Sequence, residues 1–121
     1  LYHYGMDHGE CNVHIIRYLR KNTEETENKW SGLLTTLLSE TNAERKKSIA
    51  LGETAFRAKR IDAFETKYDE LIAMGRRENK TTKNKYAKKE EAAVLNRLEK
   101  YRHNHLLYLR NFKVPFDDNM S

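Results

Sequence analysis

The last long run of the chain, residues 85–116, constrains the fold more than any other stretch. No Pro or Gly interrupts it between Tyr86 and Phe112, and its ring-bearing and apolar residues recur at steps of three and four. These residues are Val94, Leu98, Tyr101, His105, Tyr108 and Phe112. The spacing predicts one helix, about 40 Å long, with a continuous apolar stripe. Pro115 is expected to end this helix, because proline lacks a backbone donor and favours an extended predecessor.

Three further helices are predicted upstream, spanning about 10–21, 24–51 and 54–74. Gly52 and Gly75 are typical of residues that follow the last turn of a helix, so they are expected to end the second and third helices. Apolar residues at helical spacing give each helix one face to bury. These faces consist of Ile15, Tyr18 and Leu19, then Trp30, Leu33, Leu34, Leu37 and Leu38, and then Ile61, Phe64, Tyr68, Leu71 and Ile72.

The segments between these helices carry turn signals. Asn22 and Thr23 are predicted to end the first helix, and Thr23 can cap the second, because its hydroxyl can accept a bond from a first-turn amide. Residues 78–84 are predicted as a polar linker and as the most mobile part of the chain. Residues 1–9 show no helical periodicity and are predicted to be irregular.

Composition agrees with a helical fold. The chain has 121 residues, which suits one small domain, and its single Pro, five Gly and 34% charged residues favour helix over sheet. We therefore predict an all-α fold, a helical hairpin or bundle of about four helices, two of them long, with irregular ends. No apolar run approaches 18 residues, so no membrane partner is expected. A single Cys fits a reducing compartment and predicts a cytoplasmic location.

Charge is concentrated in one window. The chain carries a net charge of +5, while residues 76–89 hold seven basic residues and one acidic residue, or +6, so the remainder carries −1. The basic residues are Arg76, Arg77, Lys80, Lys83, Lys85, Lys88 and Lys89. They are candidates for binding DNA phosphates, and Tyr86 adds a ring on which a base could stack. Charge alone leaves open a flexible basic loop without a partner.

Two other groups of residues contain side chains that can bind metal ions. Cys11 and His14 lie three residues apart, a spacing that zinc can use, but no second pair supplies the remaining ligands. Asp117 and Asp118 are adjacent carboxylates after a proline, which is more typical of a solvated turn than of a magnesium site. The sequence holds no nucleophilic triad and no glycine-rich phosphate loop. It therefore predicts no metal site and no catalytic residue.

Blocks of sequence in order along nearly the whole chain resemble one known family. C-N-V-H-I-I-R-Y-L at 11–19 resembles the C-x-A-H-x-x-R-x-L block of bacterial insertion-sequence transposases of the IS-sixty-six type. Trp30 and the stretch 67–75 are similar to its W-x-x-x-(L/M) and R-Y-D-x-L-L-x-x-G blocks. L-R-N-F-K-V-P-F-D-D-N at 109–119 is similar to its L-x-D-F-x-V-P-F-x-N-N segment.

The resemblance implies a fragment of a DNA transposase. Such enzymes have a ribonuclease-H-like core whose Asp, Asp and Glu hold two Mg²⁺ or Mn²⁺ ions for DNA strand cleavage and transfer. The chain resembles the helical insertion between the second Asp and the Glu, with that Glu expected one residue beyond Ser121. Residues 1–9 would then lead in from the core, 10–116 would form the insertion domain, and 117–121 would be a frayed tail. No catalytic residue, cofactor or enzymatic activity is expected in this fragment.

The same resemblance suggests partners and positions of interest. Cys11, His14 and Arg17 match the first block and are expected to brace the catalytic core. The expected partners are the rest of that core, the DNA of the transposon ends, and further copies of the protein. Two alternatives remain open from the sequence: a free-standing helical DNA-binding module and a coiled coil that binds proteins.

Overall fold

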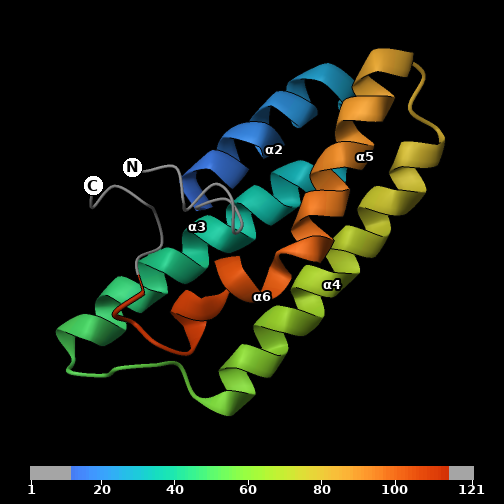
Figure 1. Cartoon of the computed structure of the whole chain (residues 1–121). Coiled ribbons are helices and arrows are strands. Elements are labelled where there is room, and N and C mark those ends of the chain that lie inside the picture. The colour runs from blue at the N-terminus through green and yellow to red at the C-terminus, as the bar shows by residue number, and fades with distance from the viewer. Residues whose placement is uncertain (1–11, 115–121) are drawn as a thin grey trace.

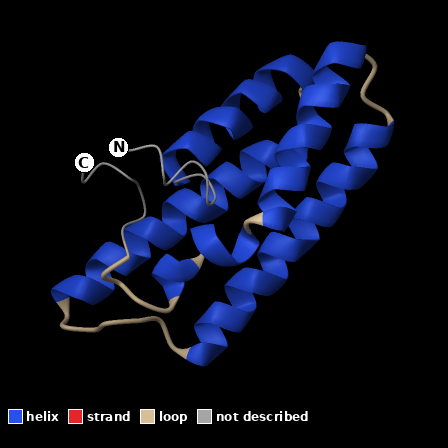
Figure 2. Ribbon diagram, viewed as in Figure 1, coloured by secondary structure: helices blue, strands red, loops and turns tan. Residues whose placement is uncertain are grey.

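The computed structural model describes residues 12–114, and within that range it contains five α-helices, one 3-10 helix and no strand. Figure 2 shows this helical content, which confirms the all-α prediction. The elements are α2 (Asn12–Thr26), α3 (Lys29–Ala50), α4 (Ala58–Lys80), α5 (Lys85–Lys100), α6 (Arg102–His105) and η1 (Leu107–Leu109). The predicted count of about four helices differs, because the expected long final helix is divided into three elements.

The four longer helices form a bundle in which successive helices run in opposite directions (Figure 1). α2 packs on α3, α3 on α4, and α4 on α5, while α5 also packs on α2 and closes the ring. The α2–α3 and α4–α5 turns therefore lie at one end of the bundle, and the α3–α4 connection lies at the other. None of the helices described here has the length and apolar character needed to cross a membrane.

The core lies along the predicted apolar faces. All five residues predicted for the face of α4 are buried, from Ile61 to Ile72. On α3, Trp30, Leu34 and Leu38 are fully buried, whereas Leu33 is 48% exposed and does not belong to the core. Spacing of three and four thus identified the face of α4 correctly. On α3, Leu33 is exposed and Leu37 is half-buried, because α3 buries a narrower strip than its leucines suggest.

The prediction of one helix over 85–116 is wrong. α5 ends at Lys100, and the chain turns at Tyr101 and again at Leu106. Leu106 and Tyr108 explain the break, because residues two apart point to nearly opposite sides of a helix and yet both are buried. Two turns fold these side chains back onto the core, where a straight helix would leave one of them in solvent.

Two predicted boundaries near the first turn are also wrong. α2 does not end at Asn22 and Thr23 but continues to Thr26, and the chain reverses at Glu27, whose φ of 61° lies in the left-handed region. Thr23 does not cap α3; its Oγ1 donates to the Leu19 carbonyl oxygen within α2, at 3.0 Å. The side chain of Asn22 is buried, and its Nδ2 donates to Ser31 Oγ and Glu91 Oε2, so it does not cap a helix end either.

α4 runs past its predicted end. Gly75 is an interior residue of this helix, and a Cβ placed on it would lie 2.8 Å from Trp30 Cδ2 and 2.8 Å from Leu95 Cδ2. The glycine therefore lets Trp30 approach the backbone of α4 closely. Since α4 continues to Lys80, the predicted linker at 78–84 is reduced to residues 81–84.

α4 also begins later than predicted, at Ala58, because the preceding residues bond to the end of the described chain. Phe56 N donates to the Leu109 carbonyl oxygen at 3.1 Å, and Phe112 N donates to the Thr54 carbonyl oxygen at 2.8 Å. The rings of Phe56 and Phe112 meet edge to face, with centroids 5.0 Å apart. This contact holds the segment after η1 against the α3–α4 connection.

Candidate nucleic-acid interface

A buried carboxylate organises the end of the bundle where the two tight turns meet. Glu91 is 0% exposed and accepts hydrogen bonds from five neutral side chains. Its Oε2 accepts from Asn22 Nδ2 at 3.0 Å, Asn28 Nδ2 at 2.8 Å and Trp30 Nε1 at 2.8 Å, and its Oε1 accepts from Asn79 Nδ2 at 2.9 Å and Thr82 Oγ1 at 3.0 Å. We call these six residues the Glu91 network. It joins α2, α3, α4, α5 and both turns.

The charge on Glu91 is stabilised without a cation among the described residues. Burial favours the neutral acid and raises its pKa, but hydrogen bonds from Trp30, Asn79, Asn28 and Asn22 outweigh that effect. The pKa of the Glu91 carboxyl is consequently below its ordinary value. A buried charge that is fully hydrogen-bonded in this way holds its partners in one arrangement.

Further contacts fix the α4–α5 turn. Asn79 Nδ2 also donates to the Lys88 carbonyl oxygen at 3.0 Å, and the Asn84 side chain caps α5 by accepting from Ala87 N at 2.9 Å. At the same end, the Glu78 carboxylate accepts from the backbone N of Lys29 and Trp30, at 3.1 and 2.9 Å. A carboxylate at a helix N-terminus also interacts favourably with the helix dipole. The turn is therefore anchored on both sides.

Six of the seven predicted DNA-binding residues lie in this anchored turn or in the adjoining ends of α4 and α5. We call them the basic tip: Arg77, Lys80, Lys83, Lys85, Lys88 and Lys89. All six side chains are exposed, and within residues 12–114 none of them forms an ion pair with a carboxylate. Lys88 Nζ lies 3.4 Å from the Lys80 carbonyl oxygen. The N-terminal end of α5 adds the positive end of its dipole to the same place.

Arg76 does not share this arrangement. Its guanidinium forms an ion pair with Glu99 and donates to Asn96 Oδ1 at 2.9 Å, so it joins α4 to α5. Arginines elsewhere in the bundle are paired in the same way: Arg60 with Glu44, and Arg102 with Asp69. The contrast separates cations that hold helices together from cations whose charge is available to a partner.

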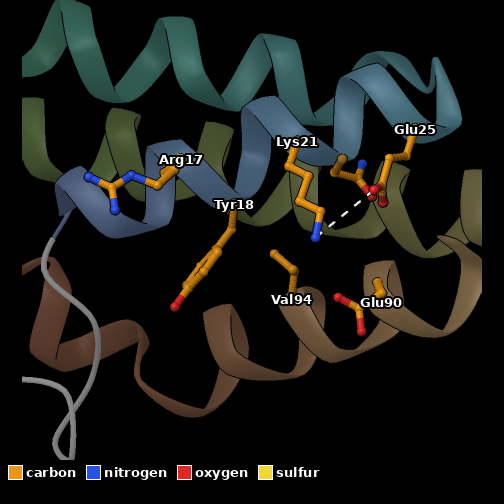
Figure 3. Close-up of a pocket in the computed structure, with 7 residues that line it drawn as sticks. Arg17, Tyr18, Lys21, Glu25, Glu90 and Val94 are labelled. Atoms are coloured by element: carbon orange, nitrogen blue, oxygen red, sulfur yellow. Dashed lines mark ion pairs between the residues drawn. The ribbon is translucent and has the colours of Figure 1, made fainter. Parts of the chain in front are cut away.

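The predicted positions on the first helix lie elsewhere. Cys11 lies outside the described residues, His14 is half-buried on α2, and Arg17 is exposed on the same helix. Figure 3 shows Arg17 at a groove between α2 and α5. The groove is also lined by Tyr18, Lys21, Asn22, Glu25, Glu90 and Val94.

This groove is lined by residues of both charges and has a small volume. Its volume of about 220 Å³ is below that of ordinary small-molecule sites. Lys21 and Glu25 form an ion pair of 4.0 Å along its edge, and the guanidinium carbon of Arg97 lies 5.2 Å from the centroid of the Tyr18 ring. Because Lys21 already pairs with Glu25 and Glu90 adds a second negative charge, the groove is a weaker anion site than the basic tip.

The residues described here do not fit a catalytic metal centre. Within residues 12–114 no group of three or more His, Cys, Asp or Glu side chains is placed to hold a metal ion. Both oxygens of the buried Glu91 carboxylate are occupied by protein donors. Asp117 and Asp118 lie outside the described residues.

Sequence reasoning missed the Glu91 network. A signal was present, because Glu91 lies at helical spacing from Ala87, Leu95 and Leu98, all of which are buried. A charged residue on an apolar face requires partners, and Asn is the kind of residue that supplies neutral donors from the ends of helices. Which asparagines converge on it depends on how the helices pack.

Comparison with known proteins gives one family. The family model described as Transposase IS66 family matches residues 2–121, nearly the whole chain. Comparison with curated proteins found no match, and comparison with solved structures found none. The family match agrees with the sequence blocks at 11–19 and 109–119, which resemble the same group of transposases.

Proposed function

Because this chain belongs to the IS66 family of transposases, we propose that its helices form an insertion within a ribonuclease-H-like catalytic core. The bundle would space and stiffen that core, with Cys11, His14 and Arg17 bracing it. The carboxylates that bind Mg²⁺ or Mn²⁺ and cut DNA would lie in other parts of the intact protein. The Glu91 network supports a stiffening role, since it joins all four long helices at one end.

We also propose that the basic tip contacts transposon DNA. The observation that carries this proposal is the set of exposed cations that lack a carboxylate partner within residues 12–114 and lie in or beside a turn anchored by Glu91. Lysines placed in this way neutralise phosphates and release counterions, which produces affinity that depends strongly on salt. An anchored turn loses less conformational entropy on binding than a mobile loop would.

Two variants with equal charge changes test the contact. The tip variant carries Lys83→Gln, Lys85→Gln, Lys88→Gln and Lys89→Gln. The control variant carries Lys46→Gln, Lys47→Gln, Lys59→Gln and Lys67→Gln, which are exposed positions on α3 and α4 toward the opposite end of the bundle. Fluorescence anisotropy with a labelled duplex should show weaker binding by the tip variant and near-normal binding by the control variant. Equal losses would overturn the proposal.

A separate assay tests the proposed absence of catalysis. The chain is incubated with supercoiled plasmid and Mg²⁺ or Mn²⁺, and nicked or linear products are measured on a gel. We expect no cleavage above a blank purified in parallel. Cleavage that co-purifies with the chain would contradict the proposal that the catalytic carboxylates lie in other parts of the intact protein.

A further inference from the structure

We propose that the basic tip binds single-stranded DNA, such as the unpaired end of a duplex, and that one base stacks on the ring of Tyr86. This inference deepens the proposed function and rests on it. Tyr86 is 63% exposed, whereas every other Phe, Tyr and Trp side chain described in residues 12–114 is buried or half-buried. A large ring left in solvent beside uncompensated positive charge is the combination that non-specific single-strand sites use.

The position of Tyr86 on α5 gives the ring its neighbours. It is the second residue of the helix, directly after Lys85 and three residues before Lys89. Side chains three residues apart lie on the same side of a helix, so Lys89 and the ring share one exposed face. Lys85 lies four residues before Lys89, and both lysines are exposed. Phosphates on either side of a stacked base would meet these two charges.

An acidic residue, Glu90, limits the path that the DNA strand can take across α5. Glu90 is exposed and lies four residues after Tyr86, toward the groove between α2 and α5 (Figure 3). Its charge opposes a phosphate on that side of the ring. The sugar–phosphate backbone is therefore expected to follow the Lys85 and Lys89 side of α5, away from the groove.

The chemistry of stacking selects unpaired bases. In a duplex, both faces of an internal base are covered by its neighbours, so a protein ring can reach only a terminal or unpaired base. The ring of Tyr86 is carried by a helix whose first turn is capped by Asn84, and not by a loop. The backbone that carries the ring is thus ordered before DNA arrives, which lowers the entropic cost of stacking.

The test uses a short labelled duplex in two forms, blunt and with a single-stranded thymidine extension. We expect the chain to bind the extended form about tenfold more tightly, from one stacked base. Tyr86→Ala should abolish this preference, while Tyr86→Phe, which keeps the ring, should retain it. Leu51→Ala removes a comparably exposed apolar side chain, toward the far end of the bundle, and should change nothing.

The outcomes separate the two proposals. If the chain binds both DNAs equally, or if Tyr86→Ala weakens both by the same factor, the stacking inference is wrong and the phosphate contact stands. If neither form binds in a salt-dependent manner, the proposed function fails and the inference fails with it. A thermal melt of each variant, matching that of the unaltered chain, shows that the fold is intact.

Discussion

The indole Nε1 of Trp30 donates a 2.8 Å hydrogen bond to Oε2 of Glu91, a residue 61 positions later in the chain. Trp30 is fully buried, and its ring lies against the backbone of α4 at Gly75. One side chain therefore joins α3 to both α4 and α5. Trp30 and Gly75 belong to two of the sequence blocks that resemble transposases. Their contact is a physical reason for a tryptophan at one position and a glycine at the other.

Removing the charge of Glu91 should destabilise the bundle. Glu91→Gln replaces one acceptor oxygen by an amide that donates, and it would then face donors from Asn22, Asn28 and Trp30 or from Asn79 and Thr82. We expect a loss of about 2–3 kcal/mol in the free energy of unfolding, measured by urea denaturation. Glu90→Gln, at the exposed neighbouring position, should change this free energy by less than about 0.5 kcal/mol. Equal effects at the two positions would contradict the role of the network.

Replacement by alanine should lower the stability of the fold at one glycine and raise it at another. Gly75→Ala places a methyl group 2.8 Å from Trp30 and Leu95, so we expect a loss of about 1–3 kcal/mol from overpacking. Gly32→Ala, within α3, meets only Thr23 Oγ1 at 4.0 Å. It should therefore gain about 0.5–1 kcal/mol from helix propensity. Chemical denaturation of both variants measures the difference, and a gain at Gly75 would be inconsistent with the packing described.

Stability should fall in acid partly through Glu91. Its pKa is lower in the folded chain than in the unfolded chain, so the unfolded chain binds the proton more readily. The resulting stabilisation is complete above the ordinary Glu pKa and is lost as the pH falls through the lowered one. Urea midpoints from about pH 7 down to about pH 3 should drop more steeply for the unaltered chain than for Glu91→Gln. If the urea midpoints of the two proteins fall in parallel with pH, Glu91 does not contribute to the loss of stability in acid.

Arg45 should hold the segment after η1. Its Nη2 donates to the carbonyl oxygens of Phe112 and Val114, at 2.9 and 3.1 Å. In Arg45→Ala we expect faster hydrogen exchange at the Phe112 amide, which bonds to Thr54, with exchange in α2 unchanged. Lys46→Ala, at the exposed adjacent position, is the control. Unchanged exchange at Phe112 would mean that the aromatic contact with Phe56 is sufficient.

Local pattern was enough to predict the buried face of α4. On α4, five apolar residues at steps of three and four were expected to be buried, and all five are. The end of α5 could not be read in this way. Its apolar spacing continues to Phe112, and the break at Tyr101 follows from where the core lies. The same holds for Gly75, since a glycine near the end of a helical pattern usually marks a terminus.

The candidate interface was likewise predictable in part. Charge counting found the cluster around the α4–α5 turn, but it could not separate Arg76 from its neighbours. The partner of Arg76 is Glu99, which lies 23 residues away on another helix. Glu91 was detectable as a charge on an apolar face. Its five donors come from five different segments, namely α2, α3, α4 and the two turns, and only the packing of those segments brings them together.

The salt dependence of DNA binding tests the central claim most directly. On a logarithmic plot of affinity against salt concentration, each lost phosphate contact reduces the slope by about 0.9. The account predicts that the tip variant has a slope about 3 to 4 units shallower than the unaltered chain, while the control variant keeps the original slope. Identical slopes for the two variants would contradict it.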